Sequence, residues 1–222
     1  HRFWVVTQSI ANFTNLNVCY ISLKNRLKWF ASASDYRDFV VLPTNQSGRF
    51  VKQEANRVTG AQGGISFPFS TFSRVDASLG VLSRDIISTD LFTISDPNSG
   101  RTFGALGAEF ERGTSPYVEL SYVNDTARYK EFGPWHGRRI NFTARSAPSG
   151  GGELGTFTEY DVDVRTYARL TRRSLFAWRL FGRVSRGEGA QFFGIGGLDQ
   201  LRGYRYREFL GDRAAFMNLE LR

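Results

Sequence analysis

The residues of this sequence that could do chemistry are mainly acids and arginines. Asp161 and Asp163 stand two positions apart, which places both carboxylates on one face of a β-strand. Such a pair could serve as acid and base, as in glycoside hydrolysis. Arginines at alternate positions nearby favour ion pairing with the aspartates instead; they are Arg139, Arg145, Arg179 and Arg183.

Histidine and cysteine are too scarce for most other kinds of site. The sequence has two histidines, His1 and His136, and one cysteine, Cys19. A metal centre or a Ser-His-Asp arrangement is therefore not expected, and neither is an internal disulfide. No Gly-Lys-Ser/Thr phosphate loop is present. We expect no enzymatic activity, no metal and no cofactor.

Alternating apolar and polar residues predict that the charges are held on β-strands. Between residues 156 and 170, Val162 and Val164 would point to one side of a strand, and Asp161 and Asp163 to the other. A helix would mix these two sets. The residues predicted on the apolar face include Ile140, Phe142, Tyr160, Val162, Val164, Phe176, Trp178 and Leu180, and those on the charged face include Arg145, Asp161, Asp163, Arg165, Arg179 and Arg183.

The same alternation predicts about ten strands and no helix. Their ranges are roughly 1–9, 14–24, 26–37, 57–66, 73–84, 116–124, 137–147, 156–170, 174–185 and 214–222. The short connections "KNR", "PFSTF" and "TRR" contrast with long ones at 38–56, 84–115 and 186–213. Short turns on one rim and long loops on the other are typical of an outer-membrane barrel.

The composition of the polar face separates a membrane barrel from a soluble sandwich, which also alternates. Here that face carries charges of both signs at successive positions, as a wet lumen would, while the apolar face would meet lipid. Aromatic residues near predicted strand ends would form an interfacial girdle. They are Trp29, Tyr36, Phe67, Phe69, Tyr117 and Trp135. We therefore predict an all-β protein, an antiparallel transmembrane β-barrel of the bacterial outer membrane.

The formal net charge of +8 does not indicate a nucleic-acid partner. The basic residues are scattered singly through alternating segments rather than clustered in one run or on one face. No run of about 18 apolar residues predicts a transmembrane helix. The N-terminal residues lack the order of a signal peptide, so the chain is interpreted as a mature or internal piece of a longer protein.

The segment "FFGIGGLDQLRGYRYREFLGDRAAFMNLELR" contains Gly196-Gly197, then Arg202-Gly203-Tyr204, then a strand ending in Glu220-Leu-Arg. This order resembles the Gly-Gly…Arg-Gly-Tyr/Phe loop of the bacterial surface antigen superfamily, the BamA- and TamA-like outer-membrane assembly and translocation barrels. "LSYVNDTARYKEFGPWHGRRINFTARS" resembles a strand–turn–strand segment of the same family more loosely. "YISLKNRLKWF" and "ISFPFSTFSRVDASLG" are similar to its branch with an N-terminal periplasmic β-propeller.

The resemblance implies a sixteen-stranded barrel, of which residues 1–222 would form a partial domain from about the third strand to the twelfth. About ten strands cannot close with that geometry, so we expect an open sheet with two unpaired edges, or additional strands from another chain. The loop 186–213 would fold into the lumen, where Arg202 would meet an inward acid. Alternation places Glu220 on that face, and we expect a shielded pair with N···O within about 4 Å.

The function implied by the resemblance is insertion, assembly or translocation of proteins or other substrates at the outer membrane. Outer-membrane lipid and lipopolysaccharide would surround the barrel, other outer-membrane or periplasmic proteins would be its partners, and nucleic acid would not. Two alternatives remain: a soluble basic β-domain that binds anionic polymers, and an outer-membrane barrel enzyme such as a phospholipase. The lack of a placed Ser/His pair argues against the enzyme.

Overall fold

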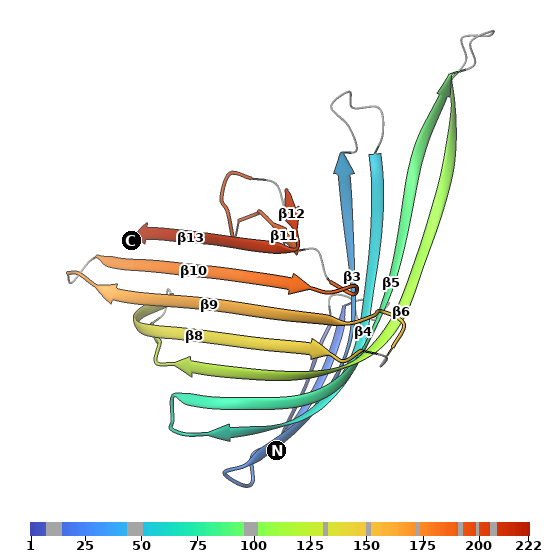
Figure 1. The fold of residues 1–222 in the computed structure, drawn as a ribbon. Helices are drawn as coiled ribbons and strands as arrows, with labels where there is room; N and C mark the ends of the chain where they lie inside the picture. Colours follow the sequence, from blue (N-terminus) through green and yellow to red (C-terminus); the bar gives the residue numbers. More distant parts are fainter. Residues whose placement is uncertain are drawn as a thin grey trace.

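The structure, a computed structural model, describes residues 1–7, 15–43, 51–95, 102–130, 133–149, 152–171, 174–190, 193–198, 200–204 and 208–222. In these ranges antiparallel strands are joined by turns (Figure 1), and no helix is long and apolar enough to cross a membrane. The strands are β1 (Arg2–Val6), β2 (Leu16–Ser22), β3 (Lys28–Pro43), β4 (Val51–Pro68), β5 (Ser73–Ser95), β6 (Thr102–Asp125), β7 (Arg128–Lys130), β8 (Gly133–Ala147), β9 (Phe157–Arg169), β10 (Leu175–Arg186), β11 (Phe193–Ile195), β12 (Phe209–Gly211) and β13 (Arg213–Leu221).

One large sheet contains most of these strands. Its order is β1-β2-β3-β4-β5-β6-β8-β9-β10-β13, with β7 paired to β8 beside this path. The short strands β11 and β12 pair with each other in the connection between β10 and β13. Up to β10, strands that are neighbours in the sheet are also consecutive in the sequence, apart from the short β7 between β6 and β8. The sheet is therefore a meander of hairpins.

Cross-strand register gathers residues of like character on each face of the large sheet. Leu79 on β5 pairs with Val118 on β6. Further along the strand order, Val164 on β9 pairs with Ile140 on β8 and with Leu180 on β10. Side chains alternate between faces along a strand, so these apolar residues share one face and the charged residues between them share the other. The face assignment agrees with the predicted alternation.

The sheet bends toward its charged face. β6 and β8 lie between β5 and β9 in the strand order, so in a flat sheet β5 and β9 would be about 14 Å apart. However, Nη2 of Arg84 on β5 lies 3.5 Å from Oε1 of Glu159 on β9. The charged face is therefore concave and the apolar face convex, and Figure 1 shows the curl of the sheet between these strands.

The long connections predicted at 38–56 and 84–115 are wrong. β3 continues to Pro43 and β4 begins at Val51, while β5 and β6 pair without a break up to Ser95 and Thr102 (Figure 1). Period-two contrast is lost in these extensions, where neighbouring residues of the sequence have the same character, as Ile86 and Ile87 do. A strand with similar residues at both parities carries no alternation signal.

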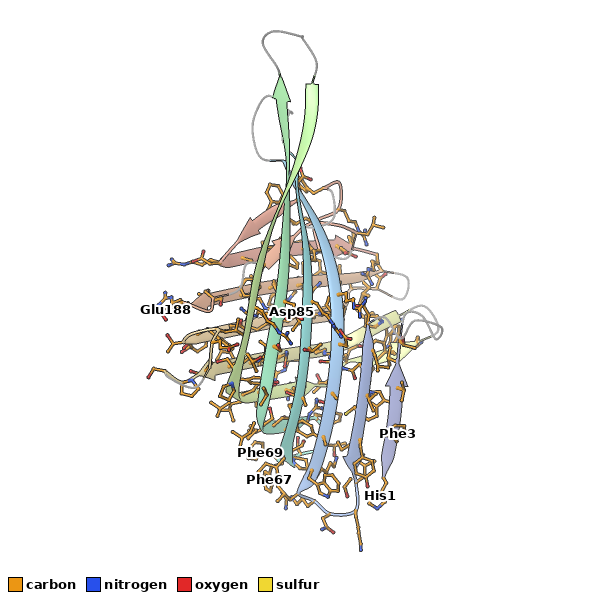
Figure 2. The ribbon with its side chains drawn as sticks, turned by 90° about the vertical axis from the view of Figure 1, so that its right-hand side faces the viewer. His1, Phe3, Phe67, Phe69, Asp85 and Glu188 are labelled. Carbon is orange, nitrogen blue, oxygen red and sulfur yellow. The ribbon has the colours of Figure 1, made fainter. Side chains whose placement is uncertain are left out.

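The residues predicted for an aromatic girdle differ in exposure, and the girdle itself stays a prediction. Trp29, Phe67 and Phe69 are exposed, and Figure 2 shows Phe67 and Phe69 at the lower end of the strands. Tyr117 is 7% exposed and lies on the concave face, where its hydroxyl donates to Gln62 Oε1 at 2.9 Å. Position along a strand does not fix exposure, because parity decides which face a side chain joins.

Trp135 also departs from the girdle. The Lys130 ammonium and the Arg169 guanidinium lie 3.8 and 4.2 Å from its ring centroid. Cations at these distances are attracted by the face of an indole ring. Trp135 therefore joins β7, β8 and the end of β9 through cation–π contacts.

The main sheet does not close on itself within the described residues. β1 pairs with β2 alone and β13 with β10 alone. The two termini of the path are thus edge strands with backbone groups available for pairing. This is the open, partial barrel that a ten-stranded part of a larger barrel predicts.

Candidate functional site

A row of charged residues crosses the concave face from β6 to β9. Arg145 on β8 is in direct register with Glu119 on β6 and Glu159 on β9. Its Nη2 lies 2.6 Å from Glu119 Oε2, and its Nη1 lies 3.4 Å from Glu159 Oε2. The guanidinium also stacks over the Tyr117 ring at 4.8 Å. One arginine therefore ties three strands together from the inside of the curve.

A second group of charges lies further along β9 and β10. Asp163 Oδ2 is 2.6 Å from Arg165 Nη2 and 2.9 Å from Arg179 Nη2. Asp161 Oδ2 lies 2.6 Å from Arg183 Nε. Both aspartates thus form ion pairs, as the arginines at alternate positions predicted.

Two of the arginines expected beside those aspartates have other partners. Arg139 Nε lies 3.8 Å from Asp125 Oδ2, and Arg145 binds Glu119 and Glu159. Direct register is the reason, since Arg139 faces Asp125 across the β6–β8 ladder. Among the residues that the structure describes, no group of three or more His, Cys, Asp or Glu side chains is placed to hold a metal ion.

The most enclosed ion pair among the described residues joins β5 to β9 across the concave face. The Arg84 and Glu159 side chains are 5% and 9% exposed. Arg84 Nη1 also donates to the Gly189 carbonyl at 2.8 Å, and its guanidinium lies 5.3 Å from the centre of the Phe157 ring. Arg84 therefore connects β5, β9 and the turn that follows β10.

An apolar cluster shields this junction. Leu82, Tyr117, Ala147 and Phe157 are buried together, with Val58 packed against them. Phe157 is 1% exposed. These side chains come from five strands or their ends, so the cluster extends over the concave face from β4 to β9. Ion pairs that water cannot reach are costly to break on one side only.

Sequence reasoning missed Arg84 as a site residue because the predicted strand ended there. The sequence did contain a usable signal. Arg84 is separated by an even number of positions from Asp76, Ser78 and Leu82, which places it on the same, polar face of the strand. The partner Glu159 lies 75 positions later in the numbering. No local pattern reports a contact over that separation.

The connection between β10 and β13 folds back onto the concave face. Phe193 and Ile195 on β11 are buried against Ala214 and Phe216 on β13, with Phe181 and Leu201 packed around them. Asn218 Nδ2 donates to the Gln200 carbonyl at 2.8 Å, which fixes the tip of the loop to β13. The described residues of this connection therefore pack on β13, and the placement of the loop 186–213 in a barrel lumen stays a prediction.

Glycines let this loop turn sharply. Gly196 and Gly197 have φ of 141° and 99°, and Gly203 has φ of 91°. Residues with a side chain rarely adopt these values. The Gly196 N–H donates to Gln200 Oε1 at 3.1 Å and closes the turn. Beyond the Arg202-Gly203 step, Tyr204 packs edge-on against Phe209 at 5.0 Å.

Arg202 lies near Glu220 but is not shielded. Its Nη2 is 3.7 Å from Glu220 Oε1, within the expected distance, yet the Arg202 side chain is 72% exposed. Glu220 forms a closer pair with Arg222, at 2.6 Å. The expected strengthening by burial is therefore wrong for Arg202, because water reaches its guanidinium. Its role in the loop remains a prediction.

A polar pocket opens between the loop and the strands. It has a volume of ≈ 580 Å³, and the residues that line it include Arg165, Arg179, Arg202, Arg222, Tyr167 and Glu220. Four arginines and one glutamate give these residues a positive balance. Arg165 and Arg179 are engaged by Asp163, so the pocket continues the ion-pair network of β9 and β10.

The geometry defines the fold class as an open part of an antiparallel β-barrel with an inward-folding loop. In solved structures, the fold is similar to that of BamA from Haemophilus ducreyi lacking POTRA domains 1–3, with a TM-score of 0.61 and 11% sequence identity. The match covers 86% of this chain and 38% of that chain. The chain therefore has a BamA-like β-barrel fold and spans well under two thirds of its neighbour.

Comparison of the sequence gives no closer assignment. No family model and no curated protein matches the chain. At 11% identity the structural likeness concerns the fold alone. The expected resemblance to the branch with a periplasmic propeller receives no support from these comparisons.

Proposed function

We propose that this chain is part of an outer-membrane β-barrel whose convex face contacts lipid and whose concave face lines an aqueous lumen. The observation that carries the proposal is the separation of the two faces. On β5, the convex face presents Val75, Ala77, Leu79 and Val81 in succession, while ion pairs occupy the concave face. Four alternate positions span about 20 Å along a strand, which at a tilt of about 35–45° covers about 15 Å of the roughly 25 Å apolar band of outer-membrane barrels.

Exposure of the apolar residues favours lipid over water as their surroundings. Leu79, Leu120, Met217 and Leu219 are each more than half exposed on the convex face. Soluble monomers rarely expose apolar patches larger than a few hundred Å². A soluble basic domain that binds anionic polymers would need this apolar surface to be covered. It would also need its basic residues for the polymer, whereas several arginines here are paired with acids on the concave face.

We propose further that the barrel acts without catalysis in the insertion, assembly or translocation of proteins at the outer membrane. The BamA-like fold supports this role, as does a loop that returns to the concave face. Outer-membrane lipid and lipopolysaccharide would surround it, with other outer-membrane or periplasmic proteins as partners. The chain covers 38% of the similar structure, so the role is proposed for the complete protein.

Membrane insertion is tested first, on the chain itself. Refolded in the presence of phospholipid vesicles, the protein should stay with the vesicles after extraction with alkaline carbonate, and it should migrate differently before and after boiling in detergent gels. Complete release into the supernatant, with one migration before and after boiling, would refute the membrane proposal.

The assembly role needs the complete protein in its own cell. Depletion should lower the amount of other barrel proteins in the outer-membrane fraction while their synthesis continues. Unchanged amounts of every outer-membrane barrel after depletion would contradict an assembly role and leave membrane insertion of this chain as a separate result.

A further inference from the structure

The convex face is not uniform, because a groove runs over β2 to β6. It has a volume of ≈ 890 Å³. Small residues form its floor; they are Ala31 and Ala33 on β3 and Ala61 and Gly63 on β4. Larger side chains form its walls, with Val18 and Tyr20 on β2 to one side and Leu79, Val81 and Val118 to the other. The groove is lined almost entirely by apolar atoms.

Register orders the face of this groove into rows. Ala31 is aligned with Gly63, Leu79 and Val118, and the next row consists of Ala33, Ala61, Val81 and Pro116. One step higher stands a polar row: Asp35, Thr59, Ser83 and Thr114. The row above that one is charged: Arg37, Arg57, Asp85 and Arg112. The lining of the groove ends at the Ala33 row. Beyond it, the same face continues to hydroxyl groups beside the Asp35 carboxylate and then to the charged row.

The charged row carries an excess of arginine at the surface. Arg57 binds Asp35 through two N–H groups, at 3.0 and 2.7 Å. Arg37 Nη2 lies 3.9 Å from Asp35, and Arg112 Nε lies 3.2 Å from Asp85. Arg112 is 79% exposed, so donors of its guanidinium remain accessible to a ligand. Figure 2 shows Asp85 well above Phe67 and Phe69 at the lower end of the strands.

We propose that this groove is a lipid site, which holds one acyl chain of a lipid whose anionic phosphate headgroup is bound by the arginines of the charged row. This inference rests on the proposed membrane insertion. The apolar floor and walls match a hydrocarbon chain, which needs no hydrogen bonds. A guanidinium presents a planar fork of donors that matches a phosphate. Hydroxyl groups between floor and arginines lie where the glycerol or sugar part of such a lipid would be.

Other occupants fit the surface less well. A polypeptide segment would bring backbone N–H and C=O groups that need partners in an apolar medium, and the groove lining offers few polar atoms. In a second copy of this chain, the same region carries three arginines and two aspartates. Two such regions facing each other would repel, because both have an excess of positive charge. A lipid phosphate instead complements the excess of positive charge.

Substitutions that fill the groove provide the first test. A Cβ added at Gly63 meets nothing nearer than 3.9 Å, so Gly63→Leu starts a bulky side chain from the floor without backbone strain at its Cβ. Gly182→Leu is the matched control, since Gly182 lies on the convex face of β10 and its added Cβ meets nothing within 4 Å. Each variant should insert into vesicles as the parent does.

Lipid binding is measured by native mass spectrometry of the detergent-solubilised protein, titrated with dipalmitoyl phosphatidylglycerol or with dipalmitoyl phosphatidylcholine. We expect one tightly held phosphatidylglycerol per chain and weaker binding of phosphatidylcholine. Gly63→Leu should remove the tightly held lipid, and Gly182→Leu should retain it. Arg57→Gln with Arg112→Gln should weaken phosphatidylglycerol binding by about tenfold, whereas Arg74→Gln, at the opposite end of β5, should leave it unchanged.

Three results would overturn the proposal. They are equal retention of lipid by Gly63→Leu and Gly182→Leu, equal affinity for the two lipids, and displacement of the bound species by inorganic phosphate alone. A shift in oligomeric state of Gly63→Leu without lipid would assign the groove to a second copy and would also overturn it. Failure of the parent protein to insert into vesicles would instead refute the proposed function on which the site depends.

Discussion

Two arginine–glutamate pairs on the concave face have similar geometry and very different surroundings. Arg84 lies 3.5 Å from Glu159, and Arg202 lies 3.7 Å from Glu220. The first arginine is 5% exposed and the second 72%. Arg84 sits under an apolar cluster at the bend of the sheet, whereas Arg202 stands at the tip of a loop.

The contrast shows that surroundings, rather than distance, set the energetic importance of a pair. When one partner of a buried pair is removed, the other charge remains in a site that water cannot reach. When one partner of an exposed pair is removed, water solvates the other charge, and the loss is about 0–1 kcal/mol. The residue in the recognisable Arg-Gly-Tyr motif is therefore not the one expected to hold the fold together.

The largest effect is expected for Arg84→Ala. It removes one of the two arginines that bind Glu159 and the donor to the Gly189 carbonyl. Glu159 keeps Arg145 at 3.4 Å, so the free energy of unfolding should fall by about 3 kcal/mol, the lower end for a buried pair broken on one side. The measurement is denaturant unfolding of the protein refolded in detergent micelles, followed by tryptophan fluorescence.

Arg74→Ala is the matched control for this change. Arg74 lies on the same strand and binds Asp76 at 2.9 Å, but its side chain is 51% exposed. The free energy of unfolding of Arg74→Ala should fall by no more than about 1 kcal/mol. Similar losses in the two variants would mean that the bend of the sheet does not depend on the buried pair.

A smaller effect is expected for Asp163→Asn. Asp163 accepts from both Arg165 and Arg179, and the amide would leave two guanidinium groups close together without their shared counter-charge. The expected loss is about 1–3 kcal/mol, and it should shrink in high salt, which screens the repulsion. Unfolding midpoints at low and high ionic strength give the measurement.

Asp212→Asn provides the comparison for Asp163. Asp212 is 53% exposed and lies 3.9 Å from Arg213, so the same substitution there should change the stability by less than about 1 kcal/mol. A loss in Asp163→Asn that does not exceed that of Asp212→Asn would place the β9–β10 ion pairs among the weak surface pairs.

Alternation predicted the parts of the fold in which one face is apolar. The separation of Val162 and Val164 from Asp161 and Asp163 follows from period two alone, and the structure has it. The extensions of β5 and β6 escaped prediction because apolar and polar residues do not alternate there in the sequence, as Ile86 and Ile87 show. Arg84 with Glu159 escaped because the contact depends on curvature, which no single strand encodes.

Within the loop, an apolar residue is expected to matter more than the motif arginine. Leu201 packs against the cluster of Phe193, Ile195 and Phe216. Leu201→Ala should weaken the packing of the loop on β13 by about 1–2 kcal/mol, since the side chain is partly buried. Limited proteolysis of the refolded protein should cut the loop several times faster in this variant. Leu198→Ala is the control, because Leu198 is 85% exposed; equal cleavage rates in both variants would exclude Leu201 as the anchor.

The smallest effect on the fold is expected for Arg202→Ala. Glu220 keeps its partner Arg222 at 2.6 Å, and Asn218 still holds the loop through Gln200. Stability should therefore change by about 0–1 kcal/mol, and the loop should resist protease as in the parent. Since the Arg202 guanidinium is accessible, a loss of activity of the complete protein in this variant would reflect contacts that Arg202 makes beyond Glu220. Rapid cleavage of the loop in Arg202→Ala would show instead that the exposed pair anchors it, and the contrast with Arg84 would fail.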